Sequence, residues 1–154
     1  FKHPEEFICS DYLEFDSTQA SKSFFGNKHD VGRRTLEIVT QIILNNNKCH
    51  LYQIGGVEDH IHIITHLHPS VALADLVKDI KLASSDYINN KKIFSNFNGW
   101  QDGYAAFTYS IEAKENLINY VKNQEEHHKT KTFVEELKEL LIEHKIEFDE
   151  KHLL

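Results

Sequence analysis

Two short segments joined by a glycine pair most strongly limit the folds open to this chain. Residues 49–54 and 60–67 are rich in Ile, Leu, Thr and His, and Gly55-Gly56 follows the first of them. β-Branched segments on either side of a short glycine-containing connection are typical of a β-hairpin. We therefore predict two neighbouring antiparallel strands with a turn at the glycine pair.

Helical periodicity flanks this hairpin on both sides. Apolar residues recur at helical spacing over about residues 31–45 and predict a helix there. A second apolar stripe, from Leu73 to Ile88, predicts a helix that Pro69-Ser70 opens and that ends near residue 90. Each helix has one apolar face, so both can cover the same sheet.

The remaining segments complete a β-α-β-β-α-β order with further helices at the C-terminus. They are a strand at 7–15, a loop at 16–30, a strand at 104–109, a helix at about 111–128 with Ser110 as its cap, and a helix at about 133–144. This order predicts an α+β, ferredoxin-like fold: four antiparallel strands with two helices on one face and additional C-terminal helices. The length of 154 residues fits one domain, 1–154.

Composition places the chain among globular proteins of a reducing compartment. Hydrophobic residues make up 40% of it, enough to bury a core, and no apolar run is long enough to span a membrane. Cys9 and Cys49 form no pair motif and no signal peptide is visible, so we expect reduced thiols and a cytoplasmic location. The chain contains no Met, which suggests that residues upstream of Phe1 are missing.

The net charge of −7 argues mildly against a nucleic acid as partner, because proteins that bind duplexes usually carry a basic surface. Local basic groups remain the candidates for nucleic-acid contacts: Lys78, Lys81, Lys91, Lys92, Arg33 and Arg34, the last two being the only arginines. Trp100 and Tyr104, next to Gly99 and Gly103, can stack on unpaired bases, or they can pack in the core.

The tripeptide His60-Ile61-His62 is the strongest indication in the sequence of a functional site. Residues two apart on a strand point to the same side, so both imidazoles project together, about 6–7 Å apart along the strand. That arrangement suits two ligands of one divalent ion, while Ile61 and Ile63 face an apolar layer on the other side. A polar strand face with scattered histidines is the alternative interpretation.

Other polar residues near this tripeptide leave the ligand set open. His66 and His68 have the same parity, so spacing alone does not decide which histidines bind an ion. Glu58 and Asp59, in the hairpin connection, are able to orient an imidazole or contact the ion.

Tyr120 and Gln124 form a second candidate pair, because residues four apart lie on the same side of a helix. A tyrosine hydroxyl attacks a phosphorus atom when a metal polarises it, and the glutamine oxygen can act as a ligand. A packing tyrosine beside a solvated glutamine is the plainer alternative. The segment 125–129 is most simply a solvated helix end, although His128 shares the helix side of Gln124.

Together these residues resemble the single-tyrosine HUH transposases of the small bacterial insertion sequences, the IS200-like family. The resemblance covers residues 34–154, and the first 33 residues match poorly. The matching motifs are Gly55–Ile64, Ala74–Lys81 with Ser84-Ser85, Trp100–Phe107, Tyr120–His128 and Lys131–Phe133.

The resemblance implies a metal-assisted DNA transesterase. His60 and His62 would bind Mg²⁺ or Mn²⁺ with Gln124 as third protein ligand, and Tyr120 would be the nucleophile. Cleavage of single-stranded DNA would leave a 5′-phosphotyrosine and a free 3′-OH, which later rejoins the strand. Members of the family are homodimers that recognise DNA hairpins at the ends of the element. In these dimers the tyrosine helix of one subunit can serve the histidines of the other.

Two other functions remain compatible with the same residues. One is a non-catalytic or domesticated single-stranded nucleic-acid binding relative, which would bind without metal and form no covalent link. The other is a metal-dependent nuclease that uses water in place of Tyr120.

Overall fold

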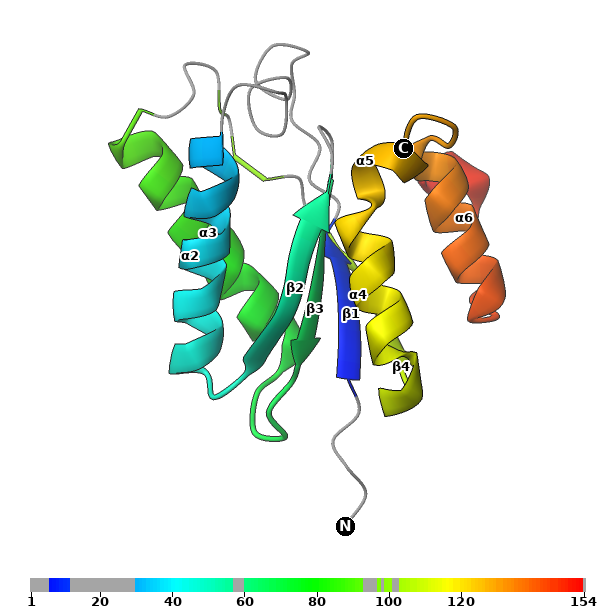
Figure 1. Ribbon diagram of the computed structural model, residues 1–154, viewed down its shortest axis with the longest axis horizontal. Coiled ribbons are helices and arrows are strands. Elements are labelled where there is room, and N and C mark those ends of the chain that lie inside the picture. The colour runs from blue at the N-terminus through cyan, green and yellow to red at the C-terminus, as the bar shows by residue number, and fades with distance from the viewer. Residues whose placement is uncertain are drawn as a thin grey trace.

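The computed structural model describes residues 6–11, 30–56, 60–92, 97, 99–100 and 103–153. The described elements follow the order β-α-β-β-α-β, and after the last strand come a 3₁₀ turn, three helices and a second 3₁₀ turn (Figure 1). Their bounds are β1 Glu6–Asp11, α2 Asp30–Asn46, β2 His50–Gly56, β3 Ile61–His66, α3 Leu73–Asn90, β4 Ala105–Tyr109, η1 Ile111–Ala113, α4 Lys114–Lys122, α5 Gln124–His127, α6 Phe133–Glu143 and η2 Glu150–His152.

The four strands form one antiparallel sheet in the order β2-β3-β1-β4. The first strand therefore lies in the middle, between β3 and β4, and the hairpin strand β2 lies at an edge. The β-α-β-β-α-β order with this strand arrangement confirms the predicted α+β, ferredoxin-like fold with added C-terminal helices.

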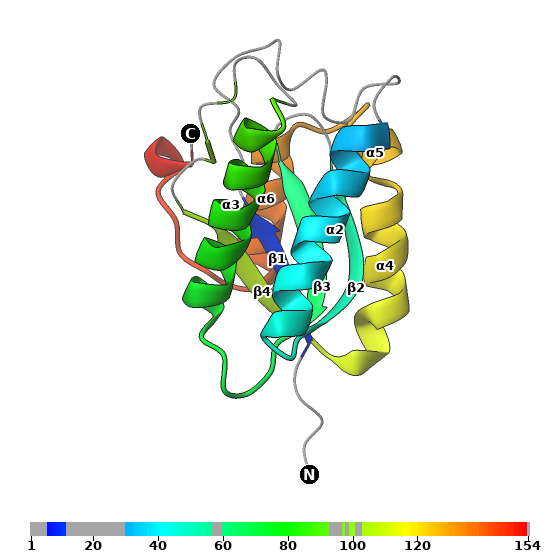
Figure 2. The same cartoon turned by 90° about the vertical axis from the view of Figure 1, so that its left-hand side faces the viewer.

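Helices α2 and α3 lie side by side on one face of the sheet (Figure 2). The largest apolar cluster fills the space beneath them, because the inward-facing residues of the strands meet the apolar stripes of both helices. Its most buried members include Leu44, Ile61, Ile63, Leu76 and Ile88.

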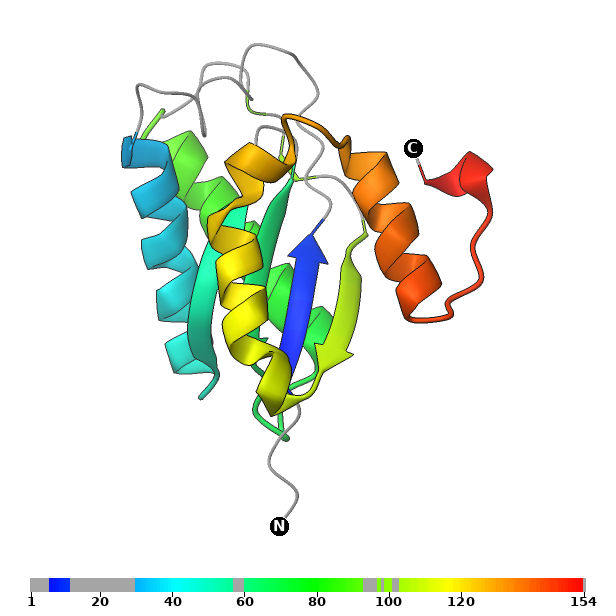
Figure 3. The same ribbon diagram turned by 45° about the vertical axis from the view of Figure 1, so that its right-hand side comes forward.

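The opposite face of the sheet carries the C-terminal helices (Figure 3). Val121 of α4 packs on Ile64 of β3, and Leu137 and Leu141 of α6 pack on Phe107 of β4. These two clusters are smaller than the one under α2 and α3, and the space between them is filled by polar side chains. None of the described helices is long and apolar enough to cross a membrane.

The glycine pair predicted as the hairpin turn belongs to the strand instead. Gly55 pairs with His62 and Gly56 with Ile61 at the end of β2. The prediction of a turn was wrong because glycine also occurs within strands, at positions where another backbone approaches closely. A Cβ on Gly55 would lie 2.7 Å from the Val121 carbonyl oxygen, so α4 rests directly on this part of β2.

The helix predicted to open at Pro69-Ser70 begins at Leu73. Ala72 occupies its N-cap position and makes no side-chain cap. The Ser70 hydroxyl instead lies 2.7 Å from Nδ1 of His68, within the turn that precedes the helix. The serine that precedes the apolar stripe therefore hydrogen-bonds within this turn and does not cap the helix.

The helix predicted over 111–128 is divided into three pieces. Ser110 precedes the 3₁₀ turn η1 without a side-chain cap, α4 follows, and Asn123 separates α4 from α5. Strand β1 begins at Glu6, and residues 12–29, which include most of the predicted loop, lie outside the described part.

Candidate active site

His60, directly before β3, and His62 within it lie on the face of the sheet that α4, α5 and α6 cover. Ile61 and Ile63 belong to the opposite apolar cluster, as the alternation of a strand requires. Both histidines are buried, with 0% and 2% of their surface exposed. Their ring centroids are 4.9 Å apart, so the two imidazoles converge on one point.

Tyr120 ends up beside the two histidines because α4 packs tightly on the strands. Its ring centroid lies 6.1 Å from that of His62, and Val121, its neighbour in α4, is buried against Ile64. Gln124 begins α5 after the break at Asn123, and its side chain is almost fully buried. The histidines and the tyrosine therefore come together within a single chain.

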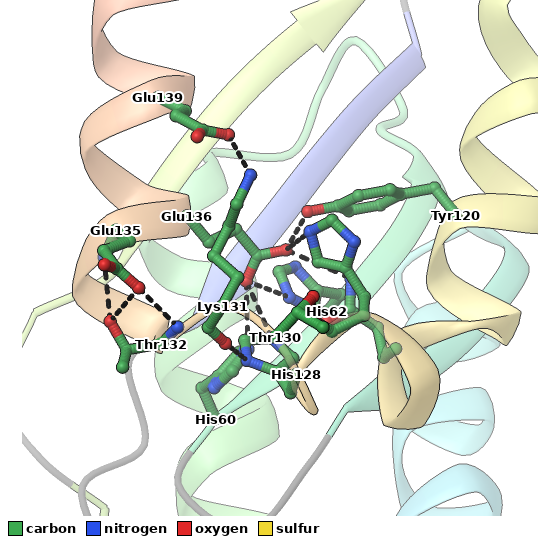
Figure 4. Close-up of polar contacts among 12 residues, drawn as sticks. His60, His62, Tyr120, His128, Thr130, Lys131, Thr132, Glu135, Glu136 and Glu139 are labelled. Carbon is green, nitrogen blue, oxygen red and sulfur yellow. Dashed lines mark hydrogen bonds and ion pairs between the residues drawn. The ribbon is translucent and has the colours of Figure 1, made fainter.

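Glu136 of α6 lies at the centre of this group (Figure 4). Its Oε1 accepts hydrogen bonds from the Tyr120 hydroxyl and, at 3.2 Å, from Nε2 of Gln124. Its Oε2 is 3.3 Å from Nε2 of His60 and 3.5 Å from Nε2 of His62. One carboxylate thus joins the tyrosine, the glutamine and the histidine pair.

The beginning of α6 fixes the position of this carboxylate. Thr132 and Glu135 form a capping box: the threonine hydroxyl accepts from the Glu135 amide, and the Glu135 carboxylate accepts from the Thr132 amide at 2.8 Å. Glu136 follows directly in the first turn, and Leu137 anchors the helix against β4.

His128 enters the group from the loop that joins α5 to α6. Its Nδ1 is 2.9 Å from the Lys131 carbonyl oxygen, and its Nε2 is 3.0 Å from Oε2 of Glu136. The expectation that 125–129 is only a solvated helix end was wrong for this residue, although Glu125 and Glu126 are exposed.

The surroundings favour an ionised glutamate and a neutral histidine. Burial opposes ionisation of Glu136, but hydrogen bonds from His60 and His62 outweigh it and lower the pKa of the carboxyl to about 2. Burial also lowers the pKa of His62, against the raising effect of its hydrogen bond to Glu136. A neutral imidazole beside a carboxylate is the protonation state that binds metal ions.

Four of these residues can hold a metal ion: His60, His62, His128 and Glu136 each offer one ligand atom, and these atoms lie within 4.8 Å of one another. Oε1 of Gln124 is also buried, and no hydrogen-bond partner for it is found in the described part of the chain. Buried polar atoms are normally satisfied, so this oxygen fits a ligand position. The donor set suits a divalent cation.

Other histidines that the sequence left open lie away from this group. His66 is at the far end of β3, where it pairs with His50. His68 is held by Ser70, and its amide donates to Sγ of the buried Cys49. Glu58 and Asp59, the other expected contacts, lie outside the described residues.

The basic candidates fall into two places. Lys78 and Lys81 line a shallow cavity of about 360 Å³ beside α3, together with Trp100 and Tyr104. Lys81 also donates to the carbonyl oxygen of Gly103. Trp100 packs against the apolar core and its Nε1 donates to Ser84 Oγ at 2.6 Å, so the core-packing alternative holds for this ring.

The second basic place is near the end of the sheet where β3 begins. Lys91 and Lys92 follow the last turn of α3 and are exposed, and the exposed Arg34 lies in the first turns of α2 at the same end (Figures 1 and 2). The side chain of Arg33 lies outside the described part.

The sequence did not single out Glu136 as a site residue. A signal was present. Phe133, Leu137 and Leu140 form the apolar stripe of α6, and Glu136 lies on that stripe at spacings of three and four residues. A carboxylate on the core-facing side of a helix needs a buried partner.

The family described as IS200-like transposases matches residues 18–124. The chain belongs to this family. The match begins upstream of residue 34, where the resemblance found in the sequence starts. It ends at Gln124, before His128 and Glu136.

Two solved structures share the fold of this IS200-like transposase. A protein from Deinococcus radiodurans R1 assigned as a transposase is 17% identical, with a TM-score of 0.55, over 80% of this chain and 93% of that chain. A REP-associated tyrosine transposase, bound to a REP hairpin, is 10% identical, with a TM-score of 0.59, over 81% of this chain and 68% of that chain. A comparison with curated protein sequences gives no match.

Proposed function

We propose that this transposase cleaves and rejoins single-stranded DNA through the hydroxyl of Tyr120. The observation that carries the proposal is the convergence of Tyr120 with His60 and His62 on one buried carboxylate. Family membership supports the reaction class, and the proximity of a tyrosine to candidate ion ligands supports the nucleophile.

His60, His62 and Gln124 would hold a divalent ion, Mg²⁺ or Mn²⁺, as the resemblance implies. Their burial and the unsatisfied Oε1 of Gln124 fit that role. When bound, such an ion polarises a phosphodiester and stabilises the charge that develops on it. The chain itself excludes bulk water from this point and holds the tyrosine ring in place.

The covalent step exchanges one phosphoester for another. The Tyr120 oxygen bonds to phosphorus, the bond to the 3′ oxygen breaks, and the proton of the phenol passes to solvent or to the leaving 3′ oxygen. The products are a 5′-phosphotyrosine and a free 3′-OH. Attack of a 3′-OH on this link reverses the exchange and rejoins a strand, so no nucleotide is consumed.

A DNA hairpin is the proposed substrate, supported by the neighbour of the same fold that is bound to one. The proposed contacts are Lys78, Lys81, Lys91, Lys92, Arg33 and Arg34. Exposed cations at the end of the sheet where β3 begins are suitably placed to hold a strand near Tyr120. The homodimer also stays a proposal, which sedimentation with and without hairpin DNA would test.

The deciding experiment uses labelled hairpin oligonucleotides from the DNA that flanks the gene. The protein is incubated with 5′- or 3′-labelled DNA, with and without Mg²⁺ or Mn²⁺, and run on a denaturing protein gel. We expect a labelled covalent adduct that needs metal and disappears in Tyr120→Phe. Tyr87→Phe, at an exposed tyrosine of α3, is the matched control and keeps the adduct.

Two other outcomes would each replace the proposal. Binding of the hairpin without any adduct under either metal would support a non-catalytic nucleic-acid binding protein. Cleaved product without an adduct, unaffected by Tyr120→Phe, would support a nuclease that uses water.

A further inference from the structure

Helix α6 contributes the charged side chain of Glu136 to the centre of the site, and the burial of this charge requires an explanation. Glu136 is 2% exposed, and it lies beyond the last residue of the family match. Carboxylates are almost never buried to this extent unless they are paired or bind a metal ion. An apolar residue at this position would complete the stripe of α6 at no such cost.

The contacts of the carboxylate divide between its two oxygens. Oε2 faces three imidazole nitrogens, Nε2 of His60, His62 and His128, at 3.3, 3.5 and 3.0 Å. Oε1 accepts from Tyr120 and Gln124. One oxygen therefore lies among potential metal ligands, and the other holds the nucleophile.

The orientation of His128 makes its Nε2 available as a ligand. A carbonyl oxygen only accepts hydrogen bonds, so Nδ1 of His128 donates its proton to Lys131 O. In the neutral ring, Nε2 then presents a lone pair to the carboxylate. Nε2 of His128 and Oε2 of Glu136 are 3.0 Å apart, close enough for both atoms to coordinate one cation.

We propose that Glu136 and His128 are also ligands of the divalent ion. The metal site then extends from His60 and His62 to the loop and helix that follow the residues matched by the family. This proposal rests on the proposed function above, since it concerns the same ion. It also assigns the class of metal. Three imidazoles and one carboxylate, together with the amide oxygen of Gln124, suit a transition-metal ion such as Mn²⁺, Co²⁺ or Zn²⁺, whereas Mg²⁺ prefers oxygen ligands and retained water.

The first test is metal affinity, measured by calorimetry on the full chain without DNA. We expect Mn²⁺ to bind at least about tenfold more tightly than Mg²⁺, and Glu136→Gln to weaken Mn²⁺ binding about tenfold or more. Glu139→Gln is the matched control, because Glu139 lies one turn further along α6 and is 62% exposed in its side chain. It should leave the Mn²⁺ affinity unchanged.

A second measurement does not depend on how Glu136→Gln folds. Pulsed electron paramagnetic resonance of Mn²⁺ bound to the wild-type protein counts coordinated imidazole nitrogens. We expect three in the wild type and two in His128→Ala. Two in both proteins, or an unchanged Mn²⁺ affinity in Glu136→Gln, would overturn the proposal.

The outcomes separate this inference from the function on which it rests. If His62→Ala abolishes Mn²⁺ binding while Glu136→Gln and His128→Ala do not, the ion is bound by the strand without the C-terminal segment, and the inference fails alone. If Mn²⁺ binds as proposed but no tyrosine adduct forms with any hairpin, the proposed function fails and the metal site stands.

Discussion

The two faces of strand β3 serve different purposes although they alternate residue by residue. Ile61 and Ile63 lie in the large apolar cluster under α2 and α3, where they hold the sheet to its helices. His60 and His62 lie on the other face, among polar side chains supplied by α4, α5, α6 and the loop before α6. One strand therefore contributes to both the apolar core and the candidate active site.

The comparison suggests a division between the two faces that substitutions can test. On the face that α2 and α3 cover, most contacts are between apolar side chains. One apolar side chain can replace another of similar volume there at little cost in stability. The α4–α6 face contains buried charge and hydrogen bonds that are satisfied only in one arrangement. A substitution on the first face should change stability, and one on the second should change the reaction.

His62→Ala should have the largest effect on the reaction. Removing one proposed ion ligand is expected to lower the rate of adduct formation by at least about 100-fold, since even indirect partners of a metal ion cost 10–100-fold. The adduct gel measures this directly. Adduct formation at the wild-type rate would break the comparison, because it would show that this face is not the chemical one.

Ile63→Ala, one residue further, should act on stability instead. Removal of a large side chain that is 1% exposed should lower the free energy of unfolding by about 2–5 kcal/mol, measured by urea titration. Ile63→Val should cost only about 0.5–1.5 kcal/mol. The adduct rate per folded molecule should stay near that of the wild type, and a selective loss of activity would contradict the division between the faces.

Gly55→Ala should affect both properties to an intermediate degree. The added Cβ would lie 2.7 Å from the Val121 carbonyl oxygen and 2.8 Å from its Cγ1, so α4 must move outward. We expect a loss of about 1–3 kcal/mol in unfolding free energy, together with slower adduct formation because Tyr120 moves with its helix. Unchanged stability and rate would show that the close packing of α4 on β2 does not set the position of Tyr120.

Thr132→Ala should have the smallest effect and sharpen the role of α6. Loss of the capping box is expected to cost about 0.5–2 kcal/mol, read from the shift of the urea midpoint. Thr130→Ala is the control, because this neighbouring hydroxyl donates to the His127 carbonyl oxygen and is not the N-cap of any helix in the described part of the chain. Equal effects in the two variants would argue against a specific role of the cap.

Much of the fold was predictable because strand and helix periodicities are local properties. The predicted hairpin strands, the helix observed at Asp30–Asn46 and the strand that ends at Tyr109 all lie close to their observed positions. The errors concern Gly55, Ser70 and Asn123, where the backbone responds to a neighbour distant in sequence or to a nearby turn. Periodicity contains no information about such neighbours.

The same limit explains which site residues were found. His60 and His62 are two residues apart at the start of β3, and Tyr120 and Gln124 are four residues apart, so local geometry already predicts that each pair lies side by side. Their metal-binding and catalytic roles stay predictions. Glu136 is sixteen residues beyond Tyr120 and on a different helix, and no local pattern predicts that its carboxylate meets the strand histidines.

The sequence by itself determined the elements, the parity that sets His60 and His62 apart from Ile61 and Ile63, and the family. Only the tertiary structure decided that α6 turns its one buried carboxylate toward that histidine pair, and that His128 points inward with it. The physical reason is that periodicity arises from the geometry of a single segment. The satisfaction of a buried charge depends on which segments the whole fold brings together.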